Sequence, residues 1–420
     1  MRANRGRRWT AWLASLLGLA AGAAAAANLD ALDLKMEPEA EAPAGPRVFV
    51  EAAIGHAERR YGLGARTISR LAVDGRGEAA LGDALHGTWS ARIDASDPAD
   101  PRIDGAVLTL REAYLSWRDP AGRYVVDAGR LNLREGPAYG YNPTDFLRDR
   151  ALRTVSSENP FSLRENRMGT VLLRGQLQWE GGSAALAWAP RLARSPSDEG
   201  FSLDLGATNG RDRALLALGQ RLSERVGARL LLYREAGGEA QVGASASALL
   251  SDAVVAHAEW SGGRGPSLLE RSTGGTGEAS AQRAAAGLTY TTAGRLSLTA
   301  EWQRNGFALD RAGWQRLAGA DPAALAAYHQ TAFALQDSAS REAWLLYAVQ
   351  RDLLLRNLDL TALLRQNRSD SSRMGWLELR YRMDRVDLAT QWQVRRGRPG
   401  SEYGLPTVKS SASVVLVVYL

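Results

Sequence analysis

The chain ends in a strand-forming stretch that restricts what can surround it. Residues 409–420 read KSSASVVLVVYL, and the apolar side chains at alternate positions from Ala412 to Leu420 share one face of an extended strand. So apolar a strand would aggregate through its edge unless that edge were paired. Closure of a sheet into a barrel pairs it, and so does burial as the last strand of a soluble sandwich. The rest of the sequence has to decide between the two.

The first 27 residues have the pattern of a secretory signal peptide. Four arginines precede an apolar run from Trp9 to Ala20, and Ala25-Ala26-Ala27 offers a cleavage site before Asn28. An uncleaved membrane anchor is the alternative, but the apolar core is short for a span. Residues 28–46 are rich in Ala, Pro and Glu, which predicts a flexible acidic periplasmic lead-in.

Composition gives no support for nucleic acid as a partner, and none is expected. The chain has 52 basic and 46 acidic residues, and four of the basic ones belong to the signal peptide, which leaves 48. The mature chain is therefore close to neutral, and its high pI is no argument for nucleic-acid binding. The chain has no cysteine, so neither disulfides nor a lipoprotein anchor are expected. After the signal peptide, no apolar run is long enough for a helical span.

The connections between strand-like segments alternate in length. Short turns are expected at 80–83, 119–122, 180–182, 222–225, 250–252, 292–295 and 383–385, and longer connections at 96–104, 134–167, 193–212, 262–280, 305–340 and 397–408. A transmembrane barrel shows this alternation, with short periplasmic turns and long extracellular loops, whereas a soluble sandwich has no reason to sort its loops. We therefore expect an all-β fold: residues 47–420 form a single antiparallel transmembrane β-barrel.

The strand count follows from parity. Both termini have to be periplasmic, so the number is even; we place eighteen strands and keep sixteen as the alternative. Phe201–Thr208 looks strand-like but would break the parity, so it is assigned to a loop. The expected spans are 47–60, 65–76, 84–95, 105–118, 123–133, 168–180, 183–192, 212–221, 226–235, 239–250, 253–261, 281–292, 295–304, 340–350, 356–366, 373–383, 385–396 and 409–420.

Alternation within strands indicates what each face meets. In 295–304, Leu298 and Trp302 oppose Glu301 and Gln303, and similar Gln, Glu and Arg faces recur in 168–180 and 385–396. Period two alone does not show which solvent wets the apolar face, but the recurring polar face suits a water-filled lumen. The segments 105–118 and 123–133 alternate poorly, so their arginines cannot be assigned to a face.

Two parts of the chain resemble known families. The C-terminal strand resembles that of Gram-negative outer-membrane β-barrels, which usually ends in an aromatic residue; here Tyr419 is followed by Leu420. The stretch Gly129–Arg174 contains a G-R strand, a glycine turn and the segment Asn142-Pro143-Thr144-Asp145. It is similar to the porin-like and polysaccharide-export barrels, the alginate-export type among them. The resemblance implies eighteen strands and an arginine-rich lumen.

The loop 134–167 is long for a connection and carries charges of both signs. Such charges can form a network that folds into the lumen and narrows it, since arginine pairs bidentately with carboxylates or phosphates. A solvated surface loop is the alternative. The candidate pore-lining and substrate-contact residues are Arg134, Asp145, Arg148, Arg150, Arg153, Arg164, Arg167 and Arg174.

A second long loop, 305–340, should contain a helix. Asp321-Pro322 has the N-cap and N1 residues of a helix, and an apolar stripe follows. We expect this helix to pack over or into the barrel mouth. The alternative is a loop helix that has no gating role.

Neither an enzyme nor a cofactor is expected. The four histidines have no metal-ligand spacing, and no catalytic or phosphate-binding motif is present, so we expect no catalytic residues, no metal and no cofactor. We expect a conduit in the cell outer membrane for polar, anionic solutes or an exported polysaccharide. Its partners would be outer-membrane lipid, those solutes and periplasmic export components. The alternative is a loop-plugged, non-conducting barrel that serves as adhesin or assembly partner.

Overall fold

The computed structural model describes residues 46–98, 105–154, 162–193, 197 and 199–420. The expected signal peptide and all of the lead-in except Pro46 lie outside these residues. The strands are β1 (Arg47–Arg59), β2 (Ala65–Ala80), β3 (Leu85–Asp97), β4 (Val107–Arg118), β5 (Tyr124–Leu131), β6 (Thr170–Trp179), β7 (Gly182–Ala189), β8 (Arg213–Ser223), β9 (Val226–Glu235), β10 (Gln241–Ser251), β11 (Val254–Pro266), β12 (Glu278–Thr291), β13 (Leu296–Asn305), β14 (Glu342–Gln350), β15 (Leu358–Asn367), β16 (Arg373–Arg382), β17 (Val386–Arg396) and β18 (Val408–Tyr419).

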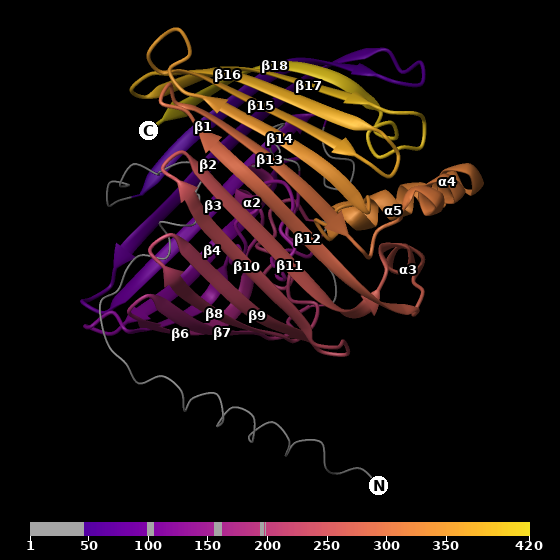
Figure 1. The fold of residues 1–420 in the computed structure, drawn as a ribbon. Coiled ribbons are helices and arrows are strands. Elements are labelled where there is room, and N and C mark those ends of the chain that lie inside the picture. Colours follow the sequence, from indigo (N-terminus) through magenta and orange to yellow (C-terminus); the bar gives the residue numbers. More distant parts are fainter. Residues whose placement is uncertain (1–45, 99–104, 155–161, 194–196, 198) are drawn as a thin grey trace.

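These strands form one closed antiparallel barrel (Figure 1). Each strand pairs with its neighbours in sequence, and β18 closes the sheet by pairing with β1 from Phe49↔Tyr419 to Arg59↔Val408. The apolar last strand therefore has no free edge, as its sequence requires. The prediction of eighteen strands is confirmed, and sixteen is excluded.

The two faces of the wall have opposite polarity. On β13, Leu298 is 43% exposed on the outside, whereas Glu301 and Gln303 are 0% exposed inside. On β18, Val414 and Leu416 face outward beside buried Ser411 and Ser413. Large apolar side chains on the outer surface and buried polar ones within are the reverse of a soluble protein, and they define a wall that crosses a lipid bilayer.

Aromatic side chains mark both edges of this apolar belt. Trp89 and Trp117 lie exposed on the outer surface near the short turns. Trp188, Trp344 and Trp392 do so toward the long loops. Amphipathic rings favour the two membrane–water interfaces, so these groups bound the hydrocarbon region.

Among the described residues the long loops carry the helices α2 (Ser162–Glu165), α3 (Leu268–Thr273), α4 (Arg311–Ala320) and α5 (Pro322–Ala334). α3, α4 and α5 lie together at one end of the barrel, whereas α2 lies within it (Figure 1). The predicted helix at Asp321-Pro322 is confirmed as α5: the Asp321 carboxylate caps it by accepting a 2.8 Å hydrogen bond from the amide of Ala323. α4 was not predicted. No helix in the described ranges is long and apolar enough to cross a membrane.

The wall is irregular between β4 and β5. β5 pairs only with Ala113–Arg118, so the first half of β4, residues 107–112, has no strand partner on that side. Arginines fill the gap: Arg130 donates to the carbonyl of Leu110 at 2.9 Å, and Arg153 donates to that of Leu108 at 2.7 Å. The strand-like stretch that begins at Phe201 is a loop, as expected, and the backbone of the preceding Gly200 accepts a hydrogen bond from the amide of Leu108. Side chains and a loop thus replace part of the strand pairing between β4 and β5. This replacement explains why the sequences of these two strands alternate poorly.

The topology predicts which loops reach the cell exterior. Cysteine introduced at Thr276, exposed in the β11–β12 loop, should react with a membrane-impermeant maleimide on intact cells. Cysteine at Glu224, exposed in the β8–β9 turn, should react only after the outer membrane is permeabilised. Both variants should retain slower migration after boiling than before it, since a closed barrel resists unfolding. Labelling of Glu224→Cys alone on intact cells would invert the topology.

Candidate functional site: the loop-constricted lumen

The barrel encloses a cavity of about 1430 Å³ lined by the β5–β6 loop, the inner wall and the end of α5. Its lining is charged rather than apolar: nine carboxylates face twelve arginines. These arginines are Arg47, Arg76, Arg111, Arg134, Arg148, Arg164, Arg167, Arg229, Arg351, Arg365, Arg380 and Arg382.

The β5–β6 loop crosses the lumen and is bound to the opposite wall. The amide of Ala138 donates to Glu259 on β11 at 2.6 Å. The amides of Tyr139 and Gly140 donate to Glu301 on β13 at 2.7 and 3.0 Å. Both carboxylates are buried. A carboxylate that accepts several backbone N–H groups fixes a loop more firmly than a neutral acceptor would.

Glu259 also organises the Asn-Pro-Thr segment. It accepts hydrogen bonds from the Asn142 side chain at 3.0 Å, and from the Thr144 amide and hydroxyl at 3.2 and 2.8 Å. On the same strand, Ser261 donates to the carbonyl of Pro143 at 2.9 Å. One wall carboxylate thus determines where the segment singled out in the sequence lies.

The close approach of loop and wall requires glycine at Gly136. Its φ of 91° favours glycine, and a Cβ atom there would lie 2.2 Å from the Glu259 carboxylate. The glycine turn of the sequence motif is therefore a point of contact with the opposite wall.

On its other side, the loop packs against the wall of β6–β9. Phe146 stacks on Tyr233 with ring centroids 4.8 Å apart, and Leu147 joins the same buried apolar cluster, which includes Leu172 and Leu215. Apolar packing anchors this end of the loop, whereas hydrogen bonds anchor the end at β11 and β13. The loop therefore narrows the lumen from one side and leaves the cavity on the other.

Asp145 and Arg167 form a bidentate ion pair at 2.7 and 3.1 Å within the loop. Burial opposes ionisation of Asp145, but the guanidinium groups of Arg167 and Arg164 outweigh it and lower the pKa of Asp145. Arg167 also donates to Asn132 and to the carbonyl of Leu133, each at 2.7 Å. Arg167 thus holds the start of the loop, at Asn132 and Leu133, to its end.

Asp337, beyond the end of α5, joins the constriction to the extracellular helices. It accepts hydrogen bonds from the Tyr141 hydroxyl at 2.6 Å and from Arg148 at 3.0 Å, and it lies 3.3 Å from Arg283. Burial opposes its ionisation, but Arg283 and Arg148 outweigh burial, so the pKa of Asp337 is lowered. The helix that we expected near the mouth is thus tied to the constriction loop.

The predicted site residues fall into two groups. Arg134, Asp145, Arg148, Arg164 and Arg167 line the cavity. Arg150, Arg153 and Arg174 are not among its described lining residues. Arg150 is exposed, Arg153 lies in the gap beside β4, and Arg174 forms a 2.8 Å ion pair with Asp127 on the inner wall.

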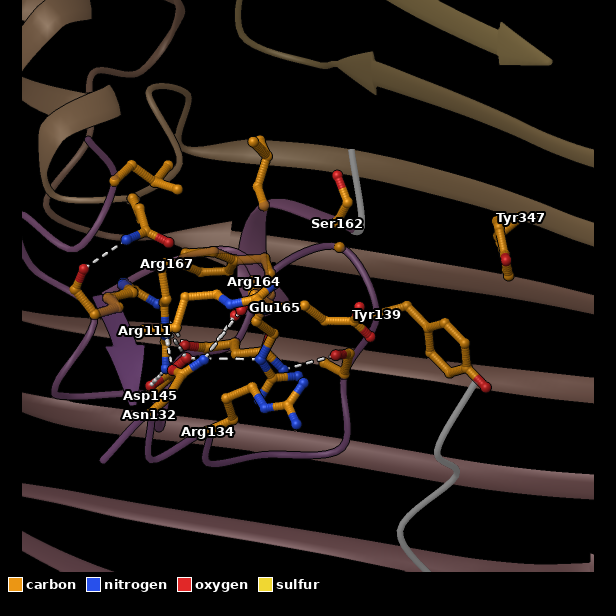
Figure 2. A pocket seen from close by; sticks show the side chains of 18 of the residues that line it. Arg111, Asn132, Arg134, Tyr139, Asp145, Ser162, Arg164, Glu165, Arg167 and Tyr347 are labelled. Atoms are coloured by element: carbon orange, nitrogen blue, oxygen red, sulfur yellow. Dashed lines mark hydrogen bonds and ion pairs between the residues drawn. The ribbon is translucent and has the colours of Figure 1, made fainter. Parts of the chain in front are cut away.

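Arg134 differs from the other predicted arginines. It is exposed in the cavity, and within the described part of the chain it makes no hydrogen bond or ion pair. Burial, and less strongly the charges of Arg167 and Arg134, outweigh nearby acids and lower the pKa of Arg164. Figure 2 shows Arg111, Arg134, Arg164 and Arg167 together around Asp145, with Tyr139 directed away toward Tyr347.

The sequence did not reveal the wall residues that hold the loop. Glu301 was placed on the polar face of its strand, but nothing marked it or Glu259 as acceptors for a loop more than a hundred residues away. Asp337 was not singled out either. A carboxylate on the lumen face of a strand, level with a long loop, is the signal that could have identified the first two.

Fold and lumen together define a porin-like barrel of the outer membrane. No protein-family model matches the sequence, and no curated protein matches it. Acinetobacter baumannii OccAB1 has a similar structure, with a TM-score of 0.56 and 10% identity over 90% of this chain and 96% of that one. Pseudomonas aeruginosa OpdL gives 0.53, with 12% identity over 89% and 98%. Pseudomonas aeruginosa OccK5 (OpdH) also gives 0.53, with 9% identity over 90% and 98%.

At these identities the likeness concerns the fold alone. It supports the porin-like part of the resemblance that the sequence suggested. It gives no support to the alginate-export part.

Removal of the Glu259 carboxylate should release the constriction. Glu259→Ala leaves the Ala138 amide and the Thr144 hydroxyl without their acceptor, and each buried donor left unpaired costs about 1–3 kcal/mol. We expect larger and noisier single-channel currents in planar bilayers, with heat-modifiable migration unchanged. Glu58→Ala, at the exposed pair with Lys409, is the control and should behave like the wild type. Equal conductance of all three proteins would contradict this account.

Acid should break the contacts of Asp337 with the loop only at low pH. Because the pKa of Asp337 is lowered in the folded protein, its ionised form stabilises the loop fully above its ordinary value of 3.8. This stabilisation is lost as the pH falls through the lowered value. The part of the conductance that depends on Asp337, taken as the difference between the wild type and Asp337→Asn, should therefore be constant from neutral pH to about 4 and vanish below it. Asp337→Asn should show altered conductance already at neutral pH; a difference between the two proteins that disappears at pH 6 would disprove the assignment.

Proposed function

We propose that this protein is a passive outer-membrane channel for small anionic solutes, with the β5–β6 loop as its constriction. The observation that carries the proposal is the excess of arginine in the cavity lining, twelve against nine carboxylates. Positive charge in a narrow lumen with low-dielectric walls raises the local concentration of anions and lowers the barrier to their passage.

The pairing of these arginines supports a channel rather than a purely structural network. Arg167 is neutralised by Asp145, and Arg148 shares Asp337 with Arg283. Arg134 has no such partner among the described residues and projects into the cavity. A solute carboxylate or phosphate can pair bidentately with its guanidinium group without displacing an internal partner.

Small solutes fit the lumen better than a polymer. The loop is held on one side by Glu259 and Glu301 and on the other by the packing of Phe146 on Tyr233. An exported polysaccharide would need a wide, continuous passage, and hence release of a loop that is fixed at both sides. The proposal therefore favours small anions over polysaccharide export, and with it over partnership with periplasmic export components.

The same anchoring supports a second candidate, a loop-plugged barrel that serves as adhesin or assembly partner. Planar-bilayer recordings separate the two. Discrete single-channel steps with anion preference support the channel. A folded, heat-modifiable barrel that conducts no ions would support the plugged form.

The selectivity should depend on Arg134. In a KCl gradient, Arg134→Glu should lower the chloride-to-potassium permeability ratio by about twofold or more, since a charge reversal in a narrow lumen acts at short range. Arg316→Glu makes the same change of charge on the exposed surface of α4 and should shift the reversal potential much less. Equal shifts in the two variants would place Arg134 outside the conducting path.

A further inference from the structure

Three arginines converge on a hollow at the extracellular edge of the outer wall. Arg373 on β16, Arg396 on β17 and Arg398 just beyond it line this hollow of about 290 Å³ together with Gln366 on β15. Strand pairing brings the first members together, because Gln366 is opposite Arg373 and Arg373 is opposite Arg396. The row crosses three adjacent strands, which Figure 1 shows in yellow and orange beside β18.

These arginines face the membrane. Arg396 continues the outward face of β17 after Trp392 and Val394, which are 43% and 40% exposed. It lies two residues, or about 7 Å, beyond the last of these apolar side chains. Gln366 likewise follows the exposed Leu364 on β15. The guanidinium groups therefore lie where the hydrocarbon region ends and lipid headgroups begin.

Within the described ranges, none of the three arginines has a hydrogen-bonded or ionic partner for its side chain. Other arginines at the same rim are paired: Arg304 lies 2.8 Å from Glu342, and Arg264 lies 3.5 Å from Glu278. The nearest carboxylate in the hollow, Asp370, accepts hydrogen bonds from the amides of Ser372 and Glu402 at 2.7 and 2.6 Å. Three positive charges thus face a single carboxylate that is already engaged.

The wall below the arginines is indented. Gly375 lies between Leu364 and Val394 in the next row, and a Cβ atom there would meet nothing closer than the carbonyl oxygen of Leu363 at 3.9 Å. Leu377 and Trp392 form the row beneath. The missing side chain leaves a gap in this row of outward-facing apolar side chains, directly below the row that contains Arg373 and Arg396.

We propose that Arg373, Arg396 and Arg398 bind the phosphate group of an outer-leaflet lipid, with one of its acyl chains lying in the gap over Gly375. Guanidinium groups match phosphate oxygens in geometry and charge, and their hydrogen bonds are strongest where water is scarce. The exposed apolar side chains around this gap favour a lipid phosphate over a free one. The lipid class that fits is a phosphorylated, acylated glycolipid such as lipid A.

The test measures lipid binding to the full mature protein in detergent by native mass spectrometry, with bisphosphorylated lipid A as probe. The Arg373→Gln, Arg396→Gln and Arg398→Gln triple variant should bind it at least about tenfold more weakly, as expected for the loss of several charge-assisted hydrogen bonds. The matched control changes the paired arginines Arg211, Arg264 and Arg304 to Gln and should lose less than about twofold. Heat-modifiable migration verifies that both variants are folded.

Two further arms separate the phosphate from the acyl chain. Dephosphorylated lipid A should bind the wild type as weakly as intact lipid A binds the triple variant. Gly375→Leu fills the gap and should weaken lipid A binding. It should not change how strongly inorganic phosphate competes with lipid A. Equal binding of intact and dephosphorylated lipid would overturn the proposal. So would competition by inorganic phosphate at concentrations equal to those of the lipid, which would indicate an anion site with no lipid specificity.

Discussion

The lumen depends on two buried carboxylates that bind the backbone of a loop. Wall strands use their own N–H and C=O groups in the barrel ladder, so a loop that enters the lumen cannot pair with their backbone. Glu259 and Glu301 supply the missing acceptors for Ala138, Tyr139 and Gly140. A loop held in this way is a fixed part of the lumen rather than a mobile flap, and the shape of the cavity follows from it.

The same requirement explains the irregular wall beside β4. Residues 107–112 of β4 lack a strand partner on the side of β5, and an unpaired carbonyl within a bilayer costs about several kcal/mol. Arg130 and Arg153 supply donors to Leu110 and Leu108, and the loop that follows β7 covers them. Where β5 is too short to pair with β4, side-chain hydrogen bonds thus replace the backbone hydrogen bonds between the two strands. At both places polar side chains complete the hydrogen bonding that strands leave open.

Strand number, topology and most strand boundaries could be predicted, because alternation and loop length are local properties of the sequence. The Asp321 cap could be predicted for the same reason, whereas α4 has no comparable signal. The site was only half accessible: the loop was recognisable by its length and charge, but Glu259 and Asp337 contact it from positions more than a hundred residues away. Which arginines line the cavity depends on those contacts, so no count along the loop could separate Arg134 from Arg153.

Arginine has different roles here, and its surroundings decide which. Arg130 and Arg153 donate hydrogen bonds to backbone carbonyls, and Arg167 forms an ion pair with Asp145. None of the three guanidinium groups is therefore available to bind a solute. Arg134 keeps its charge available because the loop exposes it to the cavity, and none of the acids that the structure describes lies within pairing distance of it. The net charge of the expected mature chain is close to neutral, but the selectivity that we propose depends on the few unpaired groups along the lumen. The anion selectivity that we propose is therefore compatible with a near-neutral chain, because carboxylates such as Asp145 are already paired with internal partners.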